Sequence, residues 1–114
     1  MNQDEVWMIN LDPTIGAEIQ KIRPAVIVSD NAFGKLPLKV IVPITDWKDK
    51  YALAPWMVKI EHSIQNGLIK ESSADTFQVR SVSELRLIRK IGTLTKSEMI
   101  KIKKGLSGVL SIEN

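Results

Sequence analysis

Short runs of apolar residues recur along the first 94 positions of the chain and are separated by polar segments. Most runs are rich in Val and Ile, and several alternate apolar with polar residues, as half-buried strands do. Turn signals such as Asp30-Asn31 and Asn66-Gly67 stand between them. We therefore expect strands at residues 6–11, 24–29, 38–44, 56–61, 77–82 and 87–94. Short strands at such close spacing are typical of a small barrel or sandwich.

The last twenty residues change to the period of a helix. Thr95 and Glu98 have the spacing of a capping box, in which each side chain bonds the other's backbone N–H. Apolar residues then recur on one face and lysines on the other. Gly105 and Gly108 fall inside this pattern, so one weakened helix or two pieces both fit. The prediction is a single domain over residues 1–114, mainly β (α+β), with a small antiparallel barrel followed by a C-terminal helix.

Composition is that of a globular domain and excludes several kinds of site. The chain has no cysteine, which excludes disulfides and thiolate metal ligands. No apolar run approaches the roughly 20 residues of a transmembrane helix. The first residues lack the pattern of a signal peptide. We therefore expect a cytoplasmic protein that does not enter a membrane.

The net charge of +3 is distributed unevenly. Residues 1–69 have a net charge of −1, whereas residues 70–104 have a net charge of +5. This skew favours an anionic partner, either a nucleic acid or an acidic protein segment. A solvated basic face explains the same charge equally well.

The usual catalytic motifs are absent from the sequence. There is no HExxH, CxxC, P-loop or GxGxxG pattern, and the one histidine, His62, is interpreted as a surface residue. Two polar residues flank apolar runs: Arg23 precedes PAVIVS and Thr45 follows VIVPI. Gln78 and Arg80 are expected to share one face of the strand at 77–82. Taken singly, each of these residues is also explained as a polar residue on an outward face.

Together, these segments resemble the MazF/PemK family of toxins. The run LDPTIGAEIQKIRPAVIVS is similar to the family's LDPTxGxE loop followed by KxRPAVIVS, and VIVPIT is similar to its VxPIT strand. Further on, GLIKESSADTFQVRSV resembles the family's GLxKxSxAxxxQ[VI]R[ST]-[VI] segment. The resemblance extends from about residue 5 to residue 94, with the helix after it.

The resemblance implies an SH3-like barrel of the CcdB/MazF/PemK type and a homodimer. It implies cleavage of single-stranded RNA without a metal or another cofactor, leaving a 2′,3′-cyclic phosphate and a 5′-OH, and an antitoxin partner similar to MazE. By position, Arg23 and Thr45 match the catalytic pair, and Glu18 matches an acidic residue whose role varies within the family. The RNA-binding candidates are Gln78, Arg80, Ser81, Trp47 and Asp46.

The chemistry of these residues is compatible with such roles. Arginine's rigid fork suits a phosphorane whose negative charge grows in the transition state. Thr45 can donate to a nonbridging oxygen, and Glu18 is the nearby group able to accept the 2′-OH proton. PemK-like members carry an aspartate where this chain has Ser83, so a mechanism built on Arg23 and Thr45 fits better.

Alternatives remain at several points. A CcdB-like gyrase poison shares the barrel, but its Trp-Gly-Ile-type C-terminus differs from the Ser-Ile-Glu-Asn of this chain. A barrel that binds RNA or protein without catalysis also fits. Trp47 and Tyr51 either stack bases or cover an end of the barrel or a dimer interface. The antitoxin's acidic segment is expected over a basic groove near Arg80, Arg86 and Arg89.

Overall fold

The computed structural model describes residues 1–113, in which seven strands precede a C-terminal helix. The strands are β1 (Glu5–Asn10), β2 (Ile22–Ile27), β3 (Leu38–Asp46), β4 (Met57–Ile60), β5 (Ser72–Asp75), β6 (Arg80–Ser83) and β7 (Leu87–Thr93), and the helix is α1 (Lys96–Leu110). Short 3₁₀ helices lie at Asn31–Phe33, Asp49–Leu53, Thr76–Gln78 and Glu84–Arg86.

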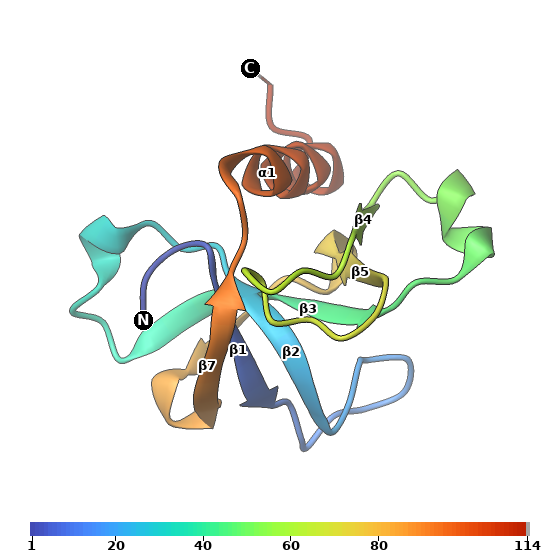
Figure 1. Cartoon of the computed structure of the whole chain (residues 1–114). Helices are drawn as coiled ribbons and strands as arrows, with labels where there is room; N and C mark the ends of the chain where they lie inside the picture. Colours follow the sequence, from blue (N-terminus) through green and yellow to red (C-terminus); the bar gives the residue numbers. More distant parts are fainter. Residues whose placement is uncertain (114) are drawn as a thin grey trace.

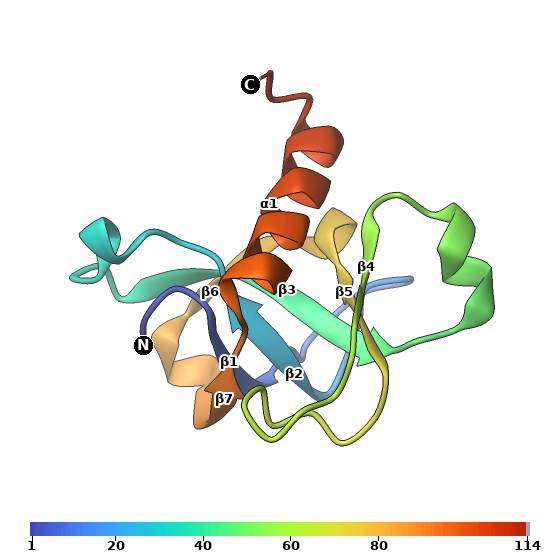
Figure 2. The ribbon, with the colours of Figure 1, turned by 45° about the horizontal axis from the view of Figure 1, so that its top comes forward.

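β3 is the central strand of the sheet, because it pairs with three others. One edge pairs with β2, while the other edge pairs first with β6 and then, near its end, with β5. The strand order is β4-β5-β3-β2-β1-β7, and all the pairs are antiparallel. Figures 1 and 2 show α1 lying across one side of this curved sheet. The predicted fold class, a small antiparallel barrel with a C-terminal helix, is confirmed.

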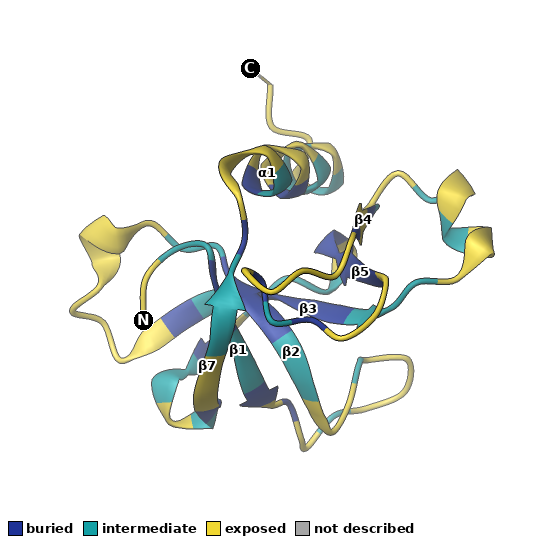
Figure 3. Ribbon diagram, in the orientation of Figure 1, coloured by how far each residue is buried: buried dark blue, intermediate teal, exposed yellow. Residues whose placement is uncertain are grey.

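Buried apolar side chains form two clusters on opposite faces of the central strands. Neighbouring residues of a strand point to opposite faces, so Val26 joins one cluster and Ile27 joins the other. The helix cluster, beneath α1, contains Val6, Val26, Val42, Ile44, Val58, Ile60, Leu68, Ala74, Leu94, Met99 and Ile102. The second cluster contains Ile9, Leu11, Ala25, Ile27, Ile41, Val82 and Leu87. In Figure 3 both clusters lie at the centre, and the loops that project from the sheet are exposed.

The strand predicted at residues 77–82 is wrong in its first half. The Thr76 hydroxyl donates to the Trp56 carbonyl oxygen at 2.6 Å, and the Asp75 carboxylate accepts from the Phe77 N–H at 3.1 Å. The first bond joins residues 20 positions apart and the second is local; the chain here forms a 3₁₀ helix, and β6 begins only at Arg80. The alternation predicted that Gln78 and Arg80 share one face of a strand. They do not, because Gln78 lies outside β6.

The helix is continuous through both of its glycines, so of the two possibilities left open by the sequence the single helix is the one that forms. Its N-terminus has the predicted capping box, with the Thr95 hydroxyl accepting from the Glu98 N–H at 3.1 Å. Gly105 packs closely on the 3₁₀ helix below, because a Cβ there would lie 3.0 Å from Thr76 Cγ2. Packing of this face therefore compensates for the low helix propensity of glycine.

Candidate functional site

A groove of about 610 Å³ lies over β1, β2 and β7 and reaches the end of β3. Met8, Pro24 and Ile44 contribute its apolar floor, and the segment from Gly67 to Lys70 lines one wall. This wall approaches β7 closely, because Gly67 has a positive φ and a Cβ there would lie 2.0 Å from the Ile91 carbonyl oxygen. Only glycine fits such a position. The predicted turn at Asn66-Gly67 thus shapes the groove.

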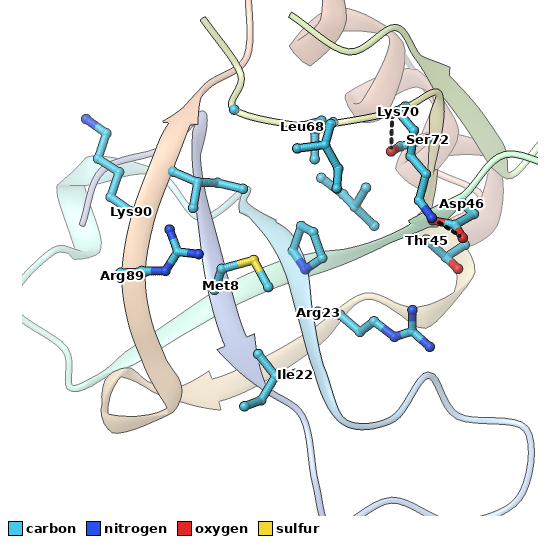
Figure 4. Close-up of a pocket in the computed structure, with 15 residues that line it drawn as sticks. Met8, Ile22, Arg23, Thr45, Asp46, Leu68, Lys70, Ser72, Arg89 and Lys90 are labelled. Carbon is cyan, nitrogen blue, oxygen red and sulfur yellow. Dashed lines mark hydrogen bonds and ion pairs between the residues drawn. The ribbon is translucent and has the colours of Figure 1, made fainter. Parts of the chain in front are cut away.

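Arg23 and Thr45 both line this groove. The β2–β3 pairing ends with Ala25 opposite Pro43, which lie two residues from Arg23 on β2 and two residues from Thr45 on β3. Figure 4 shows their side chains at the same end of the groove. Arg23 Nε donates to the Gln20 carbonyl oxygen at 3.4 Å. The structure therefore brings together the two residues that the sequence singled out at strand ends.

Cations surround the groove, and some of them are paired. Lys70 Nζ lies 3.0 Å from Asp46 Oδ2, and Lys90 Nζ lies 3.5 Å from Glu5 Oε2. Arg23 and Arg89 form no ion pair within residues 1–113. The groove thus combines an apolar floor with a positive rim, which suits a phosphodiester chain.

Asp46 is the last residue of β3. It pairs with Ser72 of β5, and its carboxylate is held by Lys70. Lys70 and Lys90 are groove residues that the sequence reasoning did not single out. Lys70 matches the lysine of the GLxKxSxA segment and both lysines lie in the basic stretch 70–104, but neither signal specifies which lysines reach the site.

Glu18 lies in a neighbouring groove of about 520 Å³ rather than beside Arg23 and Thr45. This second groove lies between the β1–β2 loop and the segment that joins β5 to β6, and it also contains Gln78 and Arg80. Glu18 Oε1 accepts from the Ile15 N–H at 2.7 Å. The predicted catalytic trio is therefore divided between two grooves.

Gln78 is supported from below by a buried carboxylate. Asp75 is 5% exposed, and its Oδ2 accepts from Gln78 Nε2 at 3.3 Å. Burial raises the pKa of the Asp75 carboxyl above its ordinary value and outweighs the hydrogen bonds from Phe77 and Gln78, which act in the opposite direction. The side-chain amide of Gln78 is thereby fixed at one end.

Two other RNA-binding candidates line neither groove. Trp47 packs edge-to-face on Tyr51, with ring centroids 5.9 Å apart, and Lys59 Nζ lies 5.1 Å from the Trp47 centroid. Ser81 is exposed on β6, opposite Val40. Both side chains therefore lie outside the first and the second groove.

The three arginines expected to form one basic groove are separated. Arg80 Nη1 donates to the Leu11 carbonyl oxygen at 3.3 Å, and Arg86 Nη1 donates to the Asn10 carbonyl oxygen at 3.2 Å. These guanidinium groups hold the start of the β1–β2 loop, while Arg89 alone of the three lines the first groove. The prediction of one shared groove is therefore wrong.

Two further features bear on the kind of site. Within residues 1–113, no group of three or more His, Cys, Asp or Glu side chains is placed to hold a metal ion. The one helix of the described chain is too short and too polar to cross a membrane.

Comparison with known proteins gives consistent matches over almost the whole chain. A family model described as "PemK-like, MazF-like toxin of type II toxin-antitoxin system" matches residues 2–110. The chain is 30% identical to endoribonuclease MazF9 of Mycobacterium tuberculosis over 112 residues, which cover 93% of this chain and 92% of that protein.

Solved structures show the same fold at lower identity. MazF from Deinococcus radiodurans superposes with a TM-score of 0.83 at 19% identity, covering 98% of this chain and 97% of that one. An endoribonuclease in complex with its cognate antitoxin, from a mycobacterial species, superposes with a TM-score of 0.78 at 20% identity, covering 100% and 98%. With the family match over residues 2–110 and a relative aligned along nearly its full length, the chain belongs to the PemK-like, MazF-like toxins of type II toxin-antitoxin systems.

Proposed function

We propose that this chain is an endoribonuclease that cleaves single-stranded RNA, including mRNA, at a short recognition sequence and without a metal. The observation that carries this proposal is that Arg23 and Thr45 line the same groove, which has a positive rim. Its curated relative is named an endoribonuclease, which supports the same activity. RNA is the required substrate because DNA lacks the attacking 2′-OH.

In the proposed reaction the ribose 2′-oxygen attacks the adjacent phosphorus while the bond to the 5′-oxygen breaks. The products are a 2′,3′-cyclic phosphate and a 5′-OH, so the proton lost by the 2′-OH is balanced by the proton gained by the leaving oxygen. Arg23 donates to the nonbridging oxygens, where charge grows, and Thr45 donates a further hydrogen bond there. Holding the 2′-oxygen in line supplies the rest of the rate.

Glu18 is the proposed acceptor of the 2′-OH proton. One of its carboxylate oxygens is engaged by the Ile15 N–H, and because Glu18 lies in the second groove, this role requires its carboxylate to come within hydrogen-bond reach of the 2′-OH held at Arg23 and Thr45. Gln78 and Arg80 line the second groove and Asp46 lines the first, while Trp47 and Ser81 extend the proposed RNA surface beyond them. A Glu18→Gln variant tests this role, since loss of a general base lowers kcat by about 10²–10⁴-fold.

The decisive experiment is cleavage of a long single-stranded RNA by the purified protein in EDTA, with both new ends mapped. Cyclic-phosphate and 5′-OH ends at one repeated short sequence, lost in Arg23→Ala, are the expected result. An Arg23→Ala protein that is folded and still binds RNA separates catalysis from binding. If folded wild-type protein cleaves none of several RNAs, the proposal is wrong and a pure binding role takes its place.

An antitoxin whose acidic segment covers the first groove is the proposed regulator. The mycobacterial relative solved with its cognate antitoxin supports a partner of this kind. Acidic side chains suit the positive rim formed by Arg23, Lys70 and Arg89. Because mRNA is the substrate, the proposed place of action is the cytoplasm. Competition between the antitoxin and RNA for binding to this protein checks this placement.

A homodimer is the proposed assembly. Ile100 and Leu110 of α1 are 63% and 57% exposed, and a second copy of the chain packed against α1 would cover them. Sedimentation equilibrium at micromolar protein tests the proposal directly. A single species with the mass of one chain at all concentrations would contradict it.

A further inference from the structure

The loop between β1 and β2 is held near its C-terminal end by one side chain from a distant part of the sequence. Gln78 Oε1 accepts from the Ile19 N–H at 2.6 Å, and Gln78 Nε2 donates to the Ala17 carbonyl oxygen at 3.3 Å. The side-chain amide of Gln78 thus both donates to and accepts from the loop backbone, in the way that the backbone of a neighbouring strand would. This contact spans 59 residues of sequence between Ile19 and Gln78.

Gln78 is itself in a fixed position. It ends the 3₁₀ helix Thr76–Gln78, and its Nε2 also donates to the buried carboxylate of Asp75. Ile19 is fixed from the other side, because its side chain packs against the second core cluster. The contact therefore connects two ordered parts of the molecule rather than two mobile side chains.

The held backbone leads directly to Arg23. The residue after Ile19 is Gln20, whose carbonyl oxygen accepts from Arg23 Nε at 3.4 Å. This bond lies at the long end of the hydrogen-bond range, so a small shift of the Gln20 carbonyl is enough to break it. While it is formed, this bond restricts the rotation of the guanidinium plane and so the directions of its remaining N–H groups.

The base of the loop is held independently of Gln78. The Lys21 N–H donates to Asp12 Oδ1 at 2.9 Å, and the Leu11 N–H donates to the Lys21 carbonyl oxygen at 3.0 Å. Loss of the Gln78 contact therefore leaves both ends of the loop anchored and releases only the part around residues 17–20.

We infer that Gln78 is a positioning residue for Arg23: by holding residues 17–20, it keeps the Gln20 carbonyl where it orients the guanidinium. This role differs from the RNA contact that the sequence suggested for Gln78, and its value for catalysis rests on the proposed function. Gln78 thus acts on the reaction through the backbone of a loop, from the opposite wall of the second groove.

The test begins on the free protein, without RNA, by following the Arg23 Nε–H signal in nitrogen-15 NMR, assigned with Arg23→Lys. Gln78→Met removes both contacts at similar size, and exchange of the Arg23 Nε proton with water is expected to rise by about three- to tenfold. Gln78→Glu keeps an acceptor for the Ile19 N–H but loses the donor to Ala17, so its effect is intermediate. Thermal unfolding establishes that each variant is folded.

Kinetics on RNA supply the second readout. In Gln78→Met, kcat is expected to fall by about three- to tenfold while KM stays within twofold. Gln20→Ala is the matched control, because it removes a glutamine side chain from the same loop and keeps the carbonyl that Arg23 uses. This control is expected to match wild type in the Arg23 signal.

The possible outcomes separate the two proposals. An unchanged Arg23 signal in Gln78→Met, together with a raised KM, means that Gln78 contacts RNA directly and overturns the inference. A changed Arg23 signal in a protein whose wild type cleaves no RNA confirms the positioning contact and rejects the ribonuclease proposal.

Discussion

Lys70 and Asp46 form an ion pair at 3.0 Å on the rim of the Arg23 groove, and Asp46 directly follows Thr45 in β3. Both side chains are at least half exposed, so the pair contributes little to the stability of the fold. Its effect is on the electrostatic potential of the groove. The carboxylate offsets the charge of a lysine that would otherwise face an incoming phosphate.

We expect Asp46→Asn to strengthen RNA binding and leave the Tm within about 1 °C of wild type. One more unpaired cation in the groove makes the slope of log K against log salt steeper by about 0.7 for a single strand. Filter binding of an uncleaved RNA between 50 and 200 mM salt, roughly the range over which such slopes are measured, checks this expectation. Asp49→Asn, in the exposed 3₁₀ helix that follows, is the control for a general change in charge. A slope equal to that of the control would contradict a local effect.

We expect Thr45→Val to lower kcat by about 10–100-fold, because valine keeps the shape of threonine and removes the proposed donor to the phosphorane. Thr45→Ser retains a hydroxyl and is expected to stay within about tenfold of wild type. Single-turnover cleavage of a short RNA measures both variants. If Val and Ser reduce the rate equally, the hydroxyl is not the group that matters.

The two glycines of α1 provide a matched pair for stability. A Cβ at Gly108 meets no heavy atom within 4 Å, so Gly108→Ala is expected to stabilise the fold by about 1 kcal/mol and raise the Tm by about 4 °C. A Cβ at Gly105 would lie 3.0 Å from Thr76 Cγ2, and Gly105→Ala is expected to lower stability by about 1 kcal/mol. Thermal and urea unfolding compare the two. Equal changes in the same direction would show that helix propensity alone decides.

Glu5 is expected to make the fold sensitive to acid. Burial acts to raise the pKa of its carboxyl, but this is outweighed by hydrogen bonds from the Trp7 indole and the Asn2 backbone, and by the charges of the N-terminus and Lys90. The net result is a pKa below its ordinary 4.5. The unfolded chain therefore takes up this proton first as the pH falls, and the stabilisation present above pH 4.5 is lost through the folded-state pKa.

The measurement is the free energy of unfolding of wild type minus that of Glu5→Gln, as a function of pH. The difference is expected to be constant above about pH 6 and to shrink as the pH falls below 4.5. A difference that is independent of pH would mean that Glu5 acts through its shape and hydrogen bonds alone.

The strands predicted correctly from the sequence are those rich in large apolar residues, which indicate burial. The runs PAVIVS and VIVPI became β2 and β3, and Arg23 and Thr45 were found because polar residues at the ends of such runs are conspicuous. β5 was missed because Ser72, Ser73 and Ala74 are buried without being large or strongly apolar. Their burial comes from the position of β5 between β3 and β4, and a pattern of hydrophobicity does not contain that information.

The division of the site between two grooves could not be predicted from the sequence either. Glu18 lies five positions before Arg23, and this closeness suggested a shared site. The path of the β1–β2 loop instead places Glu18 in the second groove. That path depends on Gln78 and on arginines more than fifty residues away. Long-range hydrogen bonds of this kind have no local signature, whereas the capping box at Thr95 and Glu98 is local and was predicted correctly.

The threefold pairing of β3 limits how this toxin can diversify. The strand carries Val42 in one core cluster, Ile41 in the other and Thr45 at the groove, and it fixes β2, β5 and β6 by backbone bonds. A shift of one residue in its register would exchange the two core faces and turn Thr45 away from the groove at the same time. Insertions and deletions are therefore tolerated only outside this strand. We therefore expect new RNA sequence preferences to arise in the loop at residues 47–56, which can change length without moving Arg23, Thr45 or the β1–β2 loop.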